Sequence, residues 1–102
     1  MPWDDLHIER LQRGERTVCR PHGNSMRPRI LSGQRVTLDP HIEPEVGHAV
    51  LCKVGRAQCV HLVKAVRGHG DKRRYLIGNN HGGTNGWIRR AAIFGVAVKV
   101  ES

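Results

Sequence analysis

The stretch AVLCKVGRAQCVHLVKAV, residues 49–66, decides the fold. Two apolar runs flank Gly55 and Arg56, which fit a two-residue turn, so the stretch predicts an antiparallel β-hairpin. Side chains alternate between the two faces of a strand. One face then carries Ala49, Leu51, Val60, Leu62 and Lys64, and the other carries Val50, Cys52, Cys59, His61 and Val63. Lys64 therefore continues the more apolar row.

Further strand signals lie on both sides of this hairpin. They occupy residues 17–19, 35–39, 75–77 and 93–100, separated by Gly and Pro turns. Residues 78–87, with three Asn and four Gly, predict a long polar turn. Near the N-terminus, Asp4 or Asp5 fits the cap of a short helix over residues 6–13, which Gly14 ends. Many short, closely spaced strands predict an all-β fold, a small and partly open β-barrel or sandwich with a short N-terminal helix.

Length and net charge limit the number of domains and the classes of partner that the chain can have. The 102 residues fit a single core, which we assign to residues 15–102 behind an N-terminal segment of residues 1–14. The chain has 17 Lys and Arg against 9 Asp and Glu, a net charge of +8, which favours acidic partners, nucleic acid among them. The cations are scattered and no nucleic-acid-binding motif is visible, so a solvated basic surface is the preferred interpretation.

No segment indicates a membrane or secretory role. No apolar run approaches the ~20 residues of a membrane span. The sequence MPWDD at residues 1–5 is acidic and unlike a secretory signal. We therefore expect a cytoplasmic protein without membrane contact.

The cysteines allow three interpretations. The three cysteines, with no C-x-x-C spacing, do not indicate a disulfide framework. Cys52, Cys59 and His61 share a face, but two thiols and one imidazole fall short of the four ligands of structural zinc, so a half-buried strand face is preferred over a metal site. A Cys52–Cys59 disulfide is geometrically conceivable, although a reducing cytoplasm opposes it.

A second stretch, HGNSMRPRI at residues 22–30, contains the candidate nucleophile. Ser25 lies between Gly23 and Pro28, where neither a helix nor a long strand can continue. A serine on a tight turn and a lysine on an apolar strand are the two parts of a serine/lysine dyad, in which a neutral lysine amine takes the serine proton. Desolvation in an apolar row favours that neutral amine. Alone, Ser25 would be interpreted as a turn serine whose hydroxyl bonds nearby backbone.

The two stretches together resemble a known family. The segments GNSMRP at residues 23–28, LSGQRV at 31–36 and VKAV at 63–66 are similar, in order, to the serine and lysine boxes of signal peptidases and LexA-like self-cleaving repressors. The segments IGNN at 77–80, NGWI at 85–88 and IFGVAV at 93–98 are similar to the closing part of those domains.

The resemblance implies the chemistry of a serine/lysine endopeptidase. Ser25 would be the nucleophile and Lys64 the general base. Gly23, Asn24 and Met26 would form the oxyanion and substrate loop, with Asn79 and Asn80 as support. The substrate would be an extended peptide added as a strand beside the site. The 24 residues before Ser25 contain no Ala, so the expected substrate is another protein rather than the chain itself. No cofactor or metal is expected, and a homodimer stays open.

An alternative interpretation is the same fold without peptidase activity. Gln34 and His48 stand where the family has Asp after Gly, and Asn79 replaces the Asp of its G-D-N motif. With the small size and basic charge, these departures fit an inactive β-barrel that serves as a small basic binding or regulatory module.

Overall fold

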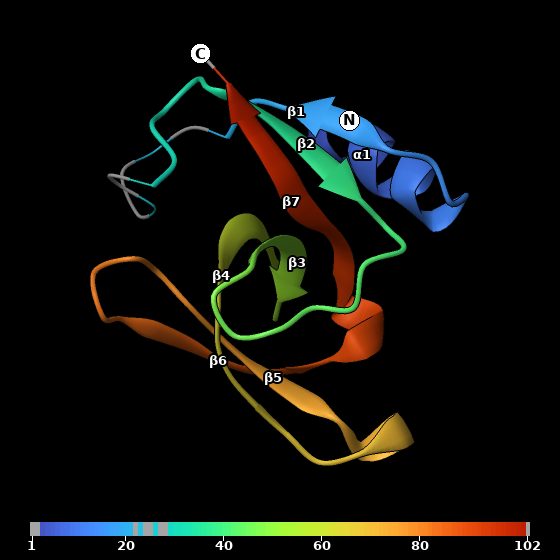
Figure 1. The fold of residues 1–102 in the computed structure, drawn as a ribbon, viewed down its shortest axis with the longest axis vertical. Coiled ribbons are helices and arrows are strands. Elements are labelled where there is room, and N and C mark those ends of the chain that lie inside the picture. Colours follow the sequence, from blue (N-terminus) through green and yellow to red (C-terminus); the bar gives the residue numbers. More distant parts are fainter. Residues whose placement is uncertain (1–2, 22, 24–25, 27–28, 102) are drawn as a thin grey trace.

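The computed structural model describes residues 3–21, 23, 26 and 29–101. One α-helix and two short 3-10 helices accompany a set of β-strands (Figure 1). The elements in chain order are α1 (Trp3–Gln12), β1 (Thr17–Cys19), β2 (Arg35–Asp39), β3 (Ala49–Val54), β4 (Ala57–Arg67), η1 (Gly70–Lys72), β5 (Arg74–Gly78), β6 (Thr84–Arg89), η2 (Arg90–Ala92) and β7 (Ile93–Glu101). The predicted all-β fold with a short N-terminal helix is confirmed.

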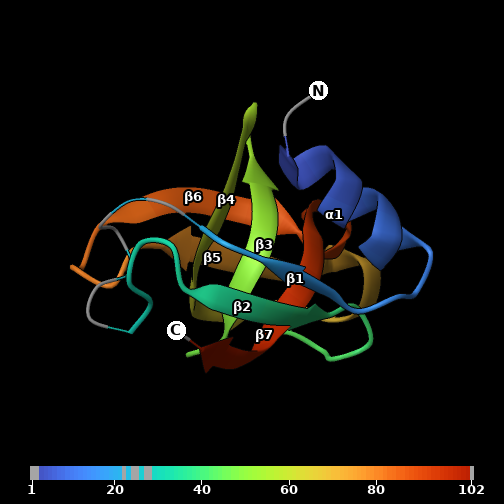
Figure 2. The same ribbon diagram turned by 90° about the horizontal axis from the view of Figure 1, so that it is seen from above.

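The strands form one seven-stranded sheet in the order β1-β2-β7-β3-β4-β5-β6, and every neighbouring pair is antiparallel. The sheet is strongly curved, so that β1, β2 and β7 cross over the β3–β4 hairpin in Figure 2. Strand β7 lies between β2 and β3, and it therefore joins the β1–β2 pair to the strands β3 to β6.

The β3–β4 hairpin has the predicted register. Val54 pairs with Ala57 across the Gly55-Arg56 turn, and Cys52 pairs with Cys59. The two faces of the hairpin pack into two different core clusters. The first contains Ala49, Leu51, Val60 and Leu62 with side chains of α1, β1 and β2, and the second contains Val50, Cys52 and Val63 with side chains of β5, β6 and β7. The hairpin is thus the shared wall of both halves of the core.

Helix α1 covers one side of the sheet through two residues. Ile8 and Leu11 are buried in the first cluster. Leu11 approaches Gly95 of β7 so closely that a β-carbon there would lie 3.0 Å from one of its methyl groups. The chain leaves the helix at Gly14, whose φ of +83° is a left-handed conformation that favours glycine. The Ile8 and Leu11 contacts hold the helix on the domain.

The predicted polar turn at residues 78–87 is shorter than expected. Strand β6 begins at Thr84 and pairs with β5 through Arg89, so only residues 79–83 form the turn. The segment is poor in β-branched residues, and its pairing with β5 supplies the order that local propensity does not. Among the described residues, no helix is long and apolar enough to cross a membrane.

Candidate active site

Lys64 lies at an irregularity in the sheet. Val63 pairs with Ile77 of β5 and Ala65 pairs with Leu76, so Lys64 is an extra residue in β4 with no opposite residue in β5. Such β-bulges re-aim a side chain and are common beside functional sites. On the other side of the strand, Val63 exchanges backbone hydrogen bonds with the Gly47-His48 segment, at 2.9 Å in each direction.

The Lys64 side chain extends over Gly78 on the predicted face. Gly78 is opposite Leu62, so a β-carbon at position 78 would share the face of Leu62. That β-carbon would lie 3.1 Å from Lys64 Cγ and 3.2 Å from Lys64 Cε. The lysine side chain is half-buried and lies on the same face of β4 as Leu62. Glycine at position 78 leaves room for its aliphatic stem.

Asn79 builds the turn beside Lys64. Its backbone N–H donates to the Gly83 carbonyl at 3.0 Å, and its side-chain Oδ1 accepts the N–H groups of His81 and Gly83 at 2.8 and 3.0 Å. This arrangement holds the Gly83 carbonyl 2.2 Å from where a β-carbon at Gly78 would be. Asn80 follows in the same turn and is half-buried. Asn79 thus fixes the conformation of the turn that follows Gly78, the residue that Lys64 contacts.

The predicted serine loop is described only in part. Ser25 and Asn24 lie outside the described residues. Gly23 has a φ of +120°, and its N–H donates to Ser32 Oγ at 3.2 Å. Met26 is buried, and its carbonyl accepts the Ile30 N–H at 3.0 Å.

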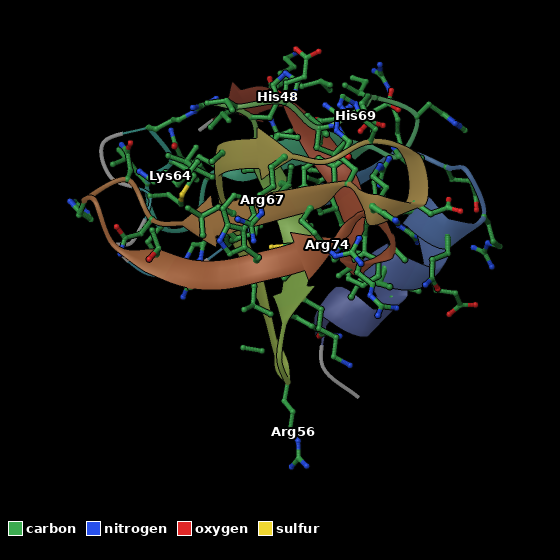
Figure 3. The ribbon with its side chains drawn as sticks, turned by 90° about the horizontal axis from the view of Figure 1, so that it is seen from below. His48, Arg56, Lys64, Arg67, His69 and Arg74 are labelled. Atoms are coloured by element: carbon green, nitrogen blue, oxygen red, sulfur yellow. The ribbon has the colours of Figure 1, made fainter. Side chains whose placement is uncertain are left out.

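The loop and the lysine strand share one core cluster. Met26, next to Ser25 in the sequence, packs in the same cluster as Leu62, two residues before Lys64. Residues 29–34, which precede β2, and the β5–β6 turn lie on the same side of the molecule in both ribbon views (Figures 1 and 2). Lys64 is on that side in Figure 3. The fold therefore brings the chain neighbours of both predicted dyad residues to one side of the molecule.

His61 points away from this site, as the hairpin register predicts. It is opposite Val50, on the face of the second core cluster. Its pKa is raised mainly by a hydrogen bond with the Cys59 thiol, against the effect of burial. His61 is therefore unsuited as a base for the serine loop.

A basic pocket lies at the other end of the β3–β4 hairpin. Its lining includes Lys53 and Arg89 from different strands, together with the aromatic rings of Trp87 and Phe94. The Arg67 guanidinium carbon is 4.4 Å from the centre of the Trp87 ring, a cation–π contact. Figure 3 shows Arg67 and Arg74 on this exposed side of β4 and β5.

Two residues near the candidate site were not singled out from the sequence. Gly78 could have been found, because a glycine at the end of an apolar strand often marks a close approach of another group. Ser32, which accepts the Gly23 N–H, carries no such local signal because the contact joins residues nine positions apart. Among the described positions, no three His, Cys, Asp or Glu side chains are grouped to hold a metal ion.

Comparisons with known proteins add no relative. No protein-family model, no curated protein and no solved structure matches the chain significantly.

Proposed function

We propose that this chain is a serine/lysine endopeptidase domain of the LexA-like and signal-peptidase type. Ser25 is the nucleophile, Lys64 is the general base, and the substrate is an extended segment of another protein. The proposal combines the order of the sequence boxes with the position of Lys64.

The observation that carries the proposal is the bulge at Lys64. At this bulge the half-buried lysine stem extends over Gly78, on the face of the core cluster that also holds Met26. A solvated surface lysine needs neither a bulge nor a glycine beneath it. A general base needs such a restrained position, within hydrogen-bond reach of the group whose proton it takes.

The proposed reaction has two halves. Ser25 Oγ attacks the substrate carbonyl carbon while the neutral Lys64 amine accepts the hydroxyl proton, and the resulting ammonium then protonates the departing amine. In the second half Lys64 takes a proton from water, whose oxygen attacks the acyl-serine ester, and Ser25 leaves with that proton. The Gly23 N–H already donates to Ser32, so we assign the oxyanion donors to the backbone of Asn24 and Ser25.

A second candidate function rests on the basic pocket. Cations on three strands around an exposed tryptophan and a half-buried phenylalanine would suit an acidic peptide or a nucleic acid, as expected of an inactive β-barrel module. In that case the bulge at Lys64 would serve sheet curvature alone.

The test is covalent labelling with a serine-reactive phosphonate at alkaline pH, read by peptide mass spectrometry. We expect the phosphonate on Ser25 in the native chain and none in Ser25→Ala. Lys64→Met should slow labelling by about 10²–10⁴-fold, the usual contribution of a general base.

Lys72→Met is the matched control, because Lys72 is exposed and should leave the rate unchanged. An unfolding curve for Lys64→Met separates loss of the base from loss of the fold. Equal labelling rates in the two lysine variants, or no labelling of Ser25 in the folded native chain, would favour the binding module.

A further inference from the structure

A thiol pair lies across the β3–β4 hairpin, on the face opposite Lys64. Cys52 and Cys59 are directly opposite each other, and their sulfur atoms are 3.9 Å apart. His61 follows two positions after Cys59 on the same face, and the two side chains share a hydrogen bond. The three groups belong to neither the proposed dyad nor the basic pocket.

The backbone geometry suits a covalent bridge. Directly opposite residues in an antiparallel pair have Cα atoms about 4.5–5.5 Å apart. Disulfides span Cα separations of about 4.4–6.8 Å. The two sulfur atoms are 3.9 Å apart. Rotation of the two side chains is therefore enough to bring them to the ~2 Å bond length of a disulfide, and the strands need not move.

The two thiols differ in exposure and ionisation. Cys52 is fully buried, and Cys59 is half-buried. The hydrogen bond from Cys52 lowers the pKa of Cys59, burial opposes this, and His61 lowers the pKa further. The same hydrogen bond and burial raise the pKa of Cys52. The Cys59 thiol therefore ionises more readily than the Cys52 thiol.

We propose that Cys59 is a hydroperoxide-reactive thiol and that Cys52 resolves it, so that the pair forms a reversible disulfide across the hairpin. A partly exposed, ionised thiol beside a resolving cysteine is the arrangement that oxidant-sensing sites use. Cys19 is different, because it is buried on β1 and burial raises its pKa to about 11.

The chemistry needs only the hydroperoxide. The Cys59 thiolate attacks the O–O bond and becomes a sulfenic acid, while the leaving alkoxide or hydroxide takes a proton from solvent. The Cys52 thiol then attacks the Cys59 sulfur, the S–O bond breaks, and the hydroxyl group leaves as water with the Cys52 proton. Two thiols are oxidised and one peroxide is reduced.

The test is treatment of the reduced, folded chain with hydrogen peroxide, followed by intact-mass and peptide mass spectrometry. We expect the loss of two hydrogens, a Cys52–Cys59 linkage, and full reversal by dithiothreitol. Cys52→Ala should instead give a dimedone-trapped sulfenic acid at Cys59, and Cys59→Ala should give neither product.

Two further variants make the result decisive. Cys19→Ala should form the bridge at the native rate, and His61→Asn should form it several-fold more slowly at neutral pH. Unfolding curves of the reduced variants identify any that fail to fold. A native chain that stays unbridged, a linkage that includes Cys19, or equal dimedone trapping at Cys52 and Cys59 would overturn the proposal.

Discussion

Lys64 of β4 lies over Gly78 of β5, beside the bulge at which the pairing of the two strands shifts by one residue. At the bulge in β4 the lysine extends over the glycine, and a β-carbon at position 78 would lie 3.1 Å from the lysine Cγ and 2.2 Å from the Gly83 carbonyl oxygen. The lysine's position therefore depends on a residue in another strand that has no side chain of its own.

Gly78→Ala should disturb both the turn and the lysine. The clash with Gly83 is with backbone, which Asn79 holds in place, so the turn must open to admit the methyl group. We expect a loss of about 1–3 kcal/mol in unfolding free energy, the usual cost of overpacking, measured in urea. Phosphonate labelling of Ser25 should fall as well. An alanine variant with native stability and native labelling would contradict this account.

Asp39→Asn should destabilise the chain at neutral pH. The Asp39 carboxylate accepts the His41 N–H at 2.8 Å and the Arg16 Nε–H at 2.7 Å, and the two bonds lower its pKa. Because Arg16 stays largely in solvent, we expect a loss of about 1 kcal/mol.

The pH dependence of this loss follows from the lowered pKa. The stabilisation is complete above the unfolded-state value of about 3.9 and is lost as the pH falls through the folded-state pKa. Urea titrations of the native and Asp39→Asn chains should therefore converge in acid. A constant difference between pH 7 and pH 3 would show that ionisation of Asp39 is not the cause.

Tyr75→Phe should raise the pKa of Glu43. Tyr75 is fully buried, and its hydroxyl donates to Glu43 Oε1, the largest cause of the lowered pKa of that carboxyl. Arg90 at 3.5 Å is a secondary cause that the variant keeps. NMR titration of the Glu43 side chain should show a shift toward the ordinary value near 4.3. An unchanged titration would mean that the arginines dominate.

Alkylation should distinguish the three cysteines. The folded, reduced chain should take up one equivalent of iodoacetamide rapidly, at Cys59, because its lowered pKa keeps the thiolate present at neutral pH. Cys19 and Cys52 are buried with raised pKa values, so they should react only after unfolding in urea, to a total of three equivalents. Rapid uptake at Cys19 in the folded chain would be inconsistent with its burial.

The hairpin was predictable because its information is local. Gly55 and Arg56 fix the turn, and the turn fixes which face every side chain takes up to Val63. The first and last residues of β1, β2 and β3 are predictable for the same reason. Gly and Pro breaks and the alternation of apolar and polar residues are signals that each span only a few residues. Alternation from Leu62 also predicts the direction of Lys64, whereas the bulge at Lys64 depends on the pairing with β5.

The remaining features depend on partners distant in sequence. Strand β6 contains Asn85 and Gly86, and only its pairing with β5 makes it a strand. Gly78 is a similar case, because a glycine is needed there only when Gly83 and Lys64 pack against it in the folded sheet. Local propensity cannot report such contacts, because they are properties of the assembled sheet.

The position of β7 between β2 and β3 has a consequence for synthesis. β7 follows every other strand in the sequence, so while a ribosome is still making the chain, β2 and β3 each lack a neighbour. Open strand edges recruit other strands, including those of nearby nascent chains. Pairings between distant segments also form slowly, in milliseconds to seconds for β-rich domains. There is therefore an interval in which β7 has not yet paired and the facing edges of β2 and β3 stay open. A chaperone that shields strand edges would be most useful then.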